Sequence, residues 1–259
     1  MYDLARLNAE LAGTAFAGKV SYARVTGSTN ADAVAAAKAG AAHGAVYLAD
    51  EQTSGRGRSD HEWASAAGAG IYVSAVQRLQ IPAARLLLLP LAAGLAAAEA
   101  MRAAAGIAAD LRWPNDVLIG PRKVAGILVE SQSGGEGFAV VGIGINVHQR
   151  EFSARLATPA TSLDLEAGRR VSRQAVLVAL LRALERETQA LADEDEARKI
   201  PGRVERASTW VRGRSVEVHG PQACSGVTAG LDGNGFLCVE TAAGVVVVQT
   251  GGLREKSSF

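Results

Sequence analysis

The stretch RWPNDVLIGPRKVAGILVE, residues 112–130, contains two short apolar runs with a Gly-Pro pair between them. The runs Val117–Ile119 and Val124–Glu130 have the length and the β-branched content of strands, and the Gly-Pro pair favours a turn that joins them. Trp113 precedes a proline, which favours an extended backbone. Lys123 comes just before the second run, so its ammonium group lies either in a pocket beside that strand or on the surface as an ordinary lysine.

Further strands and helices are predicted on both sides of this stretch. The additional strands are Ala45–Ala49, Ile71–Gln77 and Phe138–Ile143. The predicted helices are residues 2–12, Ala31–Gly40, a long Ala/Leu helix from Pro82 to about Ala105 with a kink or restart at Pro90, and roughly Ser172–Lys199, which ends before Pro201-Gly202. The pattern predicts an α+β fold in which a mixed sheet is backed by the helices at 31–40, 83–105 and 172–199.

The character of the sequence changes after Trp210. Four short β-rich runs separated by Gly-rich turns follow, at Ser215–His219, Ser225–Leu231, Phe236–Glu240 and Val245–Thr250. Runs of this length and spacing predict a small β-barrel of about fifty residues. We therefore expect two domains, a catalytic domain at residues 1–210 and a small barrel at residues 211–259.

Composition is typical of a soluble globular protein. The chain has 259 residues, 48% of them hydrophobic and 20% charged, and 27 Lys+Arg against 26 Asp+Glu give a net charge of +1. Nucleic-acid binders usually carry a basic excess, so no nucleic-acid partner is expected. The apolar stretch Leu86–Ala98 contains Pro90, which predicts a buried helix and no membrane span. No signal-peptide core is seen and two cysteines, Cys224 and Cys238, cannot form a disulfide framework, so we expect a cytoplasmic protein.

Three further motifs contain candidate binding residues. Gln52-Thr53-Ser54-Gly55-Arg56-Gly57-Arg58 interleaves glycines with arginines, so that backbone N–H and guanidinium groups can converge on a phosphate; a solvated basic loop is the alternative. Gly142-Ile143-Gly144-Ile145-Asn146 ends a predicted strand, where glycine indicates either the close approach of another group or an easing of tight packing. Ser28-Thr29-Asn30, taken alone, is typical of a helix cap.

In their order and separations these motifs together resemble the biotin–protein ligase family. Ser-Thr-Asn, Gln-x-x-Gly-Arg-Gly-Arg with a downstream Trp63, Trp-Pro-Asn-Asp-x₆-Lys-x-Ala-Gly and Gly-Ile-Gly-Ile-Asn cover about residues 25–150. The barrel expected after residue 210 resembles the family's C-terminal SH3-like domain. The resemblance implies a biotin/lipoate ligase-like catalytic domain that forms biotinoyl-5'-AMP from biotin and ATP. It also implies transfer of biotin to a lysine of a biotin carboxyl carrier protein.

Carried over residue by residue, the resemblance implies one site for biotin and one for ATP. The implied biotin-binding residues are Ser28, Thr29, Asn30, Gln52, Arg56, Gly57, Arg58, Lys123 and Gly126. The implied ATP-binding residues are Arg56, Arg58, Trp63, Asn115, Asp116, Lys123 and Asn146. Lys123 and Arg58 are the expected catalytic cations, and Trp63 is expected to stack on adenine. Mg²⁺ is expected to accompany ATP, no residue is assigned as a metal ligand, and a homodimer is left open.

The expected chemistry needs cations where negative charge builds up. Attack of the biotin carboxylate on the α-phosphorus brings two anions together, and Arg56, Arg58, Lys123 and Mg²⁺ would neutralise them. Two departures from the family pattern bear on this. Arg112 stands where the family usually has lysine, and Ser59-Asp60-His61-Glu62 follows where further basic or glycine residues are frequent. The second departure puts a third phosphate-contacting cation in doubt, because a neutral His61 serves only weakly.

Three rival functions are weighed against this one. A lipoate ligase or acyltransferase on the same scaffold is the nearest rival, but the pairing of Gly-Arg-Gly-Arg with Trp-Pro-Asn-Asp favours biotin. A DNA-binding biotin repressor is disfavoured because only about 25 residues precede Ser28, too few for the three-helix module of some family members. A non-catalytic interaction module is disfavoured by the four motifs, and biotin-dependent exchange between pyrophosphate and ATP discriminates between them.

Overall fold

The central element of the fold is a seven-stranded mixed sheet. A computed structural model describes residues 2–58, 61–132, 137–154 and 156–256. The strands of this sheet are β1 (Val20–Thr26), β2 (Val46–Gln52), β3 (Gly70–Gln77), β4 (Asp110–Arg112), β5 (Asp116–Ile119), β6 (Arg122–Gln132) and β7 (Phe138–Asn146). Their order is β1-β2-β3-β7-β6-β5-β4, in which β1 and β2 are parallel and the other neighbours are antiparallel. The predicted α+β class with a mixed sheet is confirmed.

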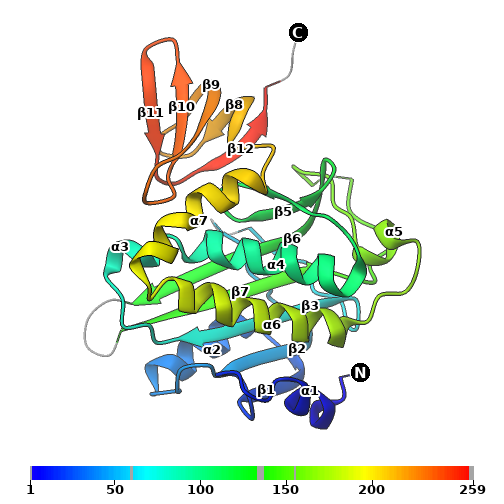
Figure 1. Cartoon of the computed structure of the whole chain (residues 1–259). Coiled ribbons are helices and arrows are strands. Elements are labelled where there is room, and N and C mark those ends of the chain that lie inside the picture. The colour runs from blue at the N-terminus through cyan, green and yellow to red at the C-terminus, as the bar shows by residue number, and fades with distance from the viewer. Residues whose placement is uncertain (1, 59–60, 133–136, 155, 257–259) are drawn as a thin grey trace.

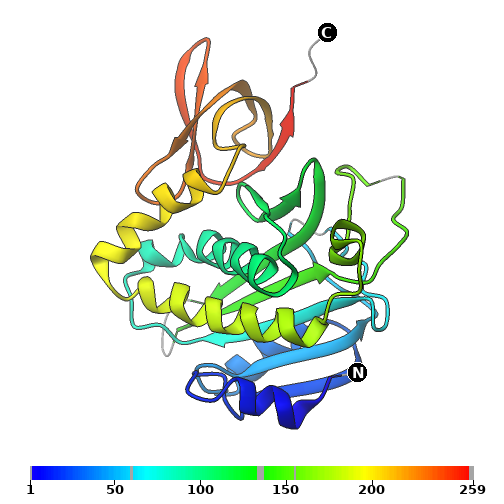
Figure 2. The same ribbon diagram turned by 45° about the vertical axis from the view of Figure 1, so that its right-hand side comes forward.

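Helices cover both faces of this sheet (Figures 1 and 2). They are α1 (Leu4–Glu10), α2 (Thr29–Lys38), α3 (Ala83–Leu86), α4 (Leu89–Ala105), α5 (Leu163–Ala167), α6 (Arg173–Ala190) and α7 (Glu194–Arg206). The long helices α4 and α6 lie next to each other across one face (Figure 1). The opposite face is covered by α2, where Ala33 and Ala37 pack with Val76 and Val140 in a separate buried cluster.

The apolar segment 83–105 forms two helices in place of one. The second of them, α4, has Pro90 in its first turn, where the missing N–H costs no intrahelical hydrogen bond. The predicted restart at Pro90 is confirmed. By length and composition the segment could cross a membrane, but 61% of its most apolar window is buried inside the protein, as in the core helix of a soluble protein.

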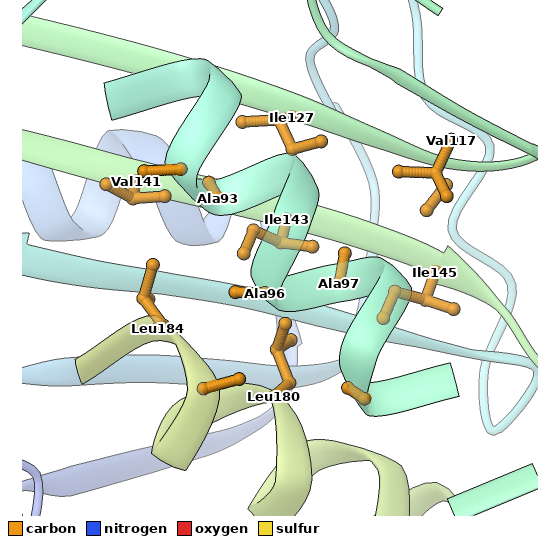
Figure 3. Packing of buried hydrophobic residues seen from close by; sticks show 14 of the residues in the cluster. Ala93, Ala96, Ala97, Val117, Ile127, Val141, Ile143, Ile145, Leu180 and Leu184 are labelled. Carbon is orange, nitrogen blue, oxygen red and sulfur yellow. The ribbon is translucent and has the colours of Figure 1, made fainter. Parts of the chain in front are cut away.

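The main core lies between the sheet and the pair α4 and α6 (Figure 3). Val141, Ile143 and Ile145 point to this face, because alternate residues of a strand share one side of the sheet. The helix side chains facing them include Ala93, Ala96 and Ala97 of α4 and Leu180 and Leu184 of α6, all buried (Figure 3). Small alanine side chains let α4 approach the strands closely, and the buried apolar surface stabilises the fold.

The predicted helix Ser172–Lys199 is wrong in its middle and at its end. α6 ends at Ala190, and α7 begins after Asp193, whose carboxylate accepts hydrogen bonds from two backbone N–H groups of the first turn. Three acidic residues in that turn also favour a helix start. α7 then passes through Pro201 and ends at Arg206, because its apolar face is buried and tertiary packing outweighs the local cost of proline.

A five-stranded sheet follows Trp210. Its strands are β8 (Arg212–His219), β9 (Cys224–Leu231), β10 (Leu237–Thr241), β11 (Gly244–Val248) and β12 (Gly252–Glu255). Their order is β11-β10-β9-β8-β12, so β11 and β12 are the edges and the sheet is open within the described residues. The predicted closed SH3-like barrel is therefore not confirmed. Buried residues of this sheet, among them Val216 and Leu237, belong to the same apolar cluster as α4 and α6.

Candidate active site

A cavity of about 710 Å³ lies on the face of the seven-stranded sheet opposite α4 and α6. Its floor is formed by β3, β6 and β7, and its rim includes Thr250–Arg254 and His219–Pro221 of the C-terminal sheet. A second cavity of about 320 Å³ lies between the N-terminal segment and the start of α6 and contains none of the predicted site residues. The larger cavity is therefore the candidate active site.

Every residue implied by the four motifs lines the larger cavity. These residues are Ser28, Thr29, Asn30, Gln52, Arg56, Gly57, Arg58, Trp63, Asn115, Asp116, Lys123, Gly126 and Asn146. They come from the start of α2, the end of β2 and its following loop, the β4–β5 turn, the start of β5, β6 and β7. Segments more than a hundred residues apart in sequence thus meet at one place, although their individual roles stay predictions.

Glycines form the floor of the cavity where two side chains approach the sheet. A Cβ atom at Gly144 of β7 would lie 2.5 Å from the Trp63 ring, and one at Gly142 would collide with Asn30 Oδ1. A Cβ atom at Gly126 on the neighbouring strand β6 would also lie close to Trp63, at 3.1 Å from its ring. Of the two explanations for the Gly-x-Gly motif, close approach of other groups is the one that the structure supports.

A hydrogen-bond network organises the cavity end beside α2. Gln52 Oε1 accepts hydrogen bonds from the Thr29 backbone N–H at 2.8 Å and from its hydroxyl at 3.0 Å. Gln52 Nε2 donates to Ser65 Oγ, and the Thr29 and Ser74 hydroxyls lie 2.9 Å apart. Ser65 and Ser74 were not predicted, since serine in a loop or strand carries no local signal. Ser28 occupies the cap position of α2, but its side chain makes no capping hydrogen bond.

The first arginine of the loop pairs with an acidic residue that the motifs did not include. Arg56 Nη2 lies 2.9 Å from Glu130 Oε2 on β6, and the Asn30 amide donates a hydrogen bond to the same oxygen. The only sequence signal for Glu130 is its place two residues beyond Leu128 on a strand whose alternate positions face the cavity.

The second arginine links the loop to the C-terminal sheet. Arg58 donates from Nη1 to the Gly251 carbonyl at 2.6 Å and from Nη2 to the Thr250 hydroxyl. Burial lowers the pKa of Arg58, against the smaller opposing effect of Asp116. Of the segment that departs from the family pattern, Ser59 and Asp60 lie outside the described residues, while His61 contacts the Arg58 carbonyl at 2.8 Å.

Asp116 holds two cations at the other end of the cavity. Lys123 Nζ lies 2.6 Å from Asp116 Oδ1, and Arg112 Nη2 lies 2.5 Å from Oδ2. Burial alone would raise the pKa of Asp116, but Lys123 and Arg112 together outweigh it and hold that pKa below its usual value. Arg112 also donates to Thr158 and lies over the Trp210 ring. The planar guanidinium of Arg112 thus contacts Asp116, Thr158 and the Trp210 ring at once, which the single ammonium group of a lysine could not do.

The remaining predicted ATP-site residues are fixed by contacts to the protein. Trp63 has its ring 5.4 Å from Lys123 Nζ, and its Nε1 is buried without a hydrogen-bond partner in the part of the chain that the structure describes. Asn115 donates to the Ile127 carbonyl at 2.9 Å, and the buried Asn146 donates to the Thr161 carbonyl at 3.1 Å. The unpartnered indole N–H is the feature of this group that calls for an acceptor from a ligand.

Comparison with known proteins supplies the family. Residues 22–147 match the model of the biotin/lipoate A/B protein ligase family. The biotin–[acetyl-CoA-carboxylase] ligase of Mycobacterium tuberculosis is 36% identical over 232 residues, which cover 87% of this chain and 85% of that protein. The chain belongs to the biotin/lipoate A/B protein ligase family. Within that family it is similar to proteins named biotin ligases.

Two further comparisons concern a longer relative and a solved structure. It is 38% identical over 169 residues to the bifunctional ligase/repressor BirA of Bacillus subtilis, a match that covers 64% of this chain and 52% of that protein. The chain thus spans about half the length of the Bacillus relatives it matches. The biotin protein ligase of Aquifex aeolicus, solved in complex with biotin and ATP, superposes with a TM-score of 0.79 at 28% identity, covering 93% of this chain and all of that one.

Proposed function

We propose that this protein is a biotin–protein ligase, which activates biotin with ATP and transfers it to a lysine of an acceptor protein. The observation that carries the proposal is the convergence of all the implied binding residues on one cavity of about 710 Å³. The similar Aquifex aeolicus ligase was solved with both biotin and ATP bound, which supports these two substrates. A lipoate substrate is the alternative within the family.

The polar end of the cavity favours biotin over lipoate. A cyclic urea presents N–H donors and a carbonyl acceptor, whereas a dithiolane ring presents neither. Thr29, Gln52 and Ser74 place donors and acceptors at this end, and Asn30 is buried among them. Asn30 Oδ1 is buried at this end without a hydrogen-bond partner among the described residues, and a ligand that supplies no donor leaves it unpaired, which disfavours that ligand. The ureido ring of biotin is therefore the group that we assign to this end.

In the first step, an oxygen of the biotin carboxylate attacks the α-phosphorus of ATP. The new bond joins that oxygen to phosphorus, the bond from the α-phosphorus to the bridging oxygen breaks, and pyrophosphate leaves. Lys123 and Arg58 would stabilise the charge that builds up on the phosphoryl oxygens, and Arg56 would bind the carboxylate. Asp116 fixes Lys123 at 2.6 Å, so this cation is in place before the substrates bind.

In the second step, the amine of an acceptor lysine attacks the carbonyl carbon of biotinoyl-AMP. The amine loses a proton, the amide bond forms and AMP leaves, so no nucleophile from the enzyme is needed. The name of the Mycobacterium tuberculosis relative, biotin–[acetyl-CoA-carboxylase] ligase, supports a carboxylase as the acceptor, and we propose a lysine of its biotin carboxyl carrier protein or domain. We also propose residues 1–210 as the catalytic unit and residues 211–259 as a separate C-terminal unit. The loop of the C-terminal unit that contains Thr250 and Gly251 holds Arg58.

A protein-held Mg²⁺ does not fit the acidic residue of the Trp-Pro-Asn-Asp motif. Both oxygens of Asp116 are already occupied, one by Lys123 and the other by Arg112. Among the residues that the structure describes, no three His, Cys, Asp or Glu side chains cluster as a metal site. We therefore assign Mg²⁺ no ligand from this chain and derive no step through it.

The proposal is tested by incubating the purified protein with biotin, ATP and Mg²⁺, followed by native mass spectrometry. The expected result is a mass increase equal to biotinoyl-AMP. Lipoate in place of biotin should give no such increase. An adenylate that forms with lipoate and not with biotin would assign the protein to the other branch of the family.

A further inference from the structure

Glu130 joins two parts of the proposed biotin site through one oxygen atom. It follows Gly126 and Leu128 at alternate positions of β6, and so faces the same side of the sheet as the cavity floor. Its Oε2 accepts one hydrogen bond from the Asn30 amide and another from Arg56 Nη2 at 2.9 Å. This oxygen thereby connects the start of α2 with the arginine loop, which are separate in sequence.

The contact with Glu130 sets the orientation of the Asn30 amide. Asn30 is buried, its amide nitrogen faces Glu130, and its Oδ1 lies over Gly142 without a hydrogen-bond partner among the described residues. In the flipped orientation the amide oxygen would face the Glu130 carboxylate, and two acceptors would repel each other. A charged acceptor at position 130 therefore selects one orientation of a buried polar group beside Thr29.

The contact of Glu130 with Arg56 positions the guanidinium and leaves several of its N–H donors available for a ligand. The Arg56 side chain is 47% exposed and that of Glu130 is 35% exposed, so the pair contributes little to the stability of the fold. Only Nη2 contacts Glu130, and the other N–H donors of the planar guanidinium can still bind an anion in the cavity. Glu130 can thus remain in contact while Arg56 binds a carboxylate.

We infer that Glu130 is a positioning residue, which orients Asn30 and Arg56 together before biotin binds. The inference rests on the proposed function, since it concerns the same site. Groups held in their binding geometry lose less freedom when the ligand arrives, so affinity rises. Glu130 touches no reacting atom in this account. Its substitution should therefore weaken biotin binding and leave the rate of adenylate formation at saturating biotin nearly unchanged.

Isothermal titration with biotin tests this inference on the intact protein. Glu130→Gln keeps the length of the side chain and removes the charge, and should weaken biotin binding about tenfold, the size expected for a hydrogen bond to a charged group. The loss of affinity caused by Glu130→Gln should be clearly smaller when Arg56→Ala or Asn30→Ala is already present. One of the two side chains that Glu130 orients is then absent. Glu130→Asp, which keeps the charge, should recover part of the affinity. Glu240→Gln on the exposed side of β10 is the matched control and should bind as the wild type does.

The outcomes separate the two claims. If wild type binds biotin and Glu130→Gln binds equally tightly, the positioning role is wrong while the proposed function stands. A loss of the same size in all three backgrounds also overturns that role, because Glu130 would then act independently of Asn30 and Arg56. If the wild-type protein binds no biotin, the proposed function fails and the inference fails with it.

Discussion

The two faces of the seven-stranded sheet use the same strands for opposite purposes. On the face toward α4 and α6, Ile143 and Ile145 of β7 are buried in an apolar core (Figure 3). On the other face, the intervening Gly142 and Gly144 leave room for Asn30 and Trp63. Side chains that fill one face give the domain its stability, and their absence from the other face creates the cavity.

Polar atoms are buried on the site face, next to the cavity. Asn30 Oδ1 and Trp63 Nε1 are buried there without hydrogen-bond partners in the described structure. A buried unpaired polar group costs about 1–3 kcal/mol, which the packed face must offset. Such groups are tolerated at sites where a ligand supplies the missing partner. The comparison therefore predicts that substitutions on the two faces separate into effects on function and effects on stability.

The largest functional effect is expected from Lys123→Met. Methionine retains much of the volume of the side chain and removes the cation that Asp116 holds at 2.6 Å. Loss of one preorganised group that stabilises the transition state typically lowers the rate on the order of 10²–10³-fold. Single-turnover quenched-flow measurement of biotinoyl-AMP should show a fall of that size, with a smaller change in biotin affinity.

The matched control for this variant is Lys38→Met on the exposed end of α2. It should form adenylate at the wild-type rate. A normal rate in Lys123→Met would remove Lys123 from the proposed mechanism and direct attention to Arg112 as the cation at that end of the cavity.

The next largest effect is expected from Gly142→Ala on the site face. The added Cβ would collide with Asn30 Oδ1, so Asn30 must move and its contact with Glu130 is disturbed. A disturbed buried hydrogen bond of about 1–3 kcal/mol corresponds to a roughly five- to 150-fold loss of biotin affinity. Titration calorimetry measures it, and Gly233→Ala, which meets no atom within 4 Å, is the control. Unchanged affinity in Gly142→Ala would show that the site face is not shaped as described.

A smaller effect, on stability and not on biotin binding, is expected from a substitution of a β7 residue on the core face. Ile145→Val removes one buried methylene and should lower the free energy of unfolding by about 0.5–1.5 kcal/mol, and Ile145 is not among the residues that line the cavity. Urea denaturation measures this change. Biotin affinity of the folded protein should stay within about twofold of wild type, because the site face is untouched. A larger loss of affinity here than in Gly142→Ala would contradict the division between the two faces.

The smallest effect concerns stability in acid. Lys123 and Arg112 hold the pKa of Asp116 below its usual value despite its burial. A carboxyl group whose pKa is lowered by folding stabilises the protein above its unfolded-state pKa of about 4. That contribution is lost as the pH falls through the lowered value. Asp116→Asn should therefore lose stability less steeply than wild type over the acid range, as thermal melts at a series of pH values would show. Parallel slopes would contradict the assigned pKa.

Motifs in the sequence predicted the site better than they predicted its surroundings. Ser28-Thr29-Asn30, Arg56-Gly57-Arg58 and Lys123 are local groups whose spacing carries information, and the structure brings them to one cavity. Ser74 and Glu130 lie in the same cavity region only because of strand register, which links Ser74 to Gly142 and places Glu130 opposite Val140. Register is set by the whole sheet and leaves no local signature.

The elements that the sequence did not predict correctly depend on tertiary packing. The edge strands β1 and β12 were missed because neither shows a clear alternation of buried and exposed residues. α7 continues through Pro201 because its buried face holds it against the core. Closure of the C-terminal strands into a barrel depends on pairing between β11 and β12, which turn signals alone cannot establish. Local patterns predict elements, whereas contacts between distant elements decide their ends and pairing.

The central claim is that the protein activates biotin with ATP in the cavity on the site face of the seven-stranded sheet. Isotope exchange between labelled pyrophosphate and ATP measures the reversal of this step directly and needs no acceptor protein. The account predicts exchange by the wild-type protein that depends on biotin, is not supported by lipoate, and is abolished or nearly abolished in Lys123→Met. Exchange that proceeds without biotin, or that lipoate supports equally well, would contradict it.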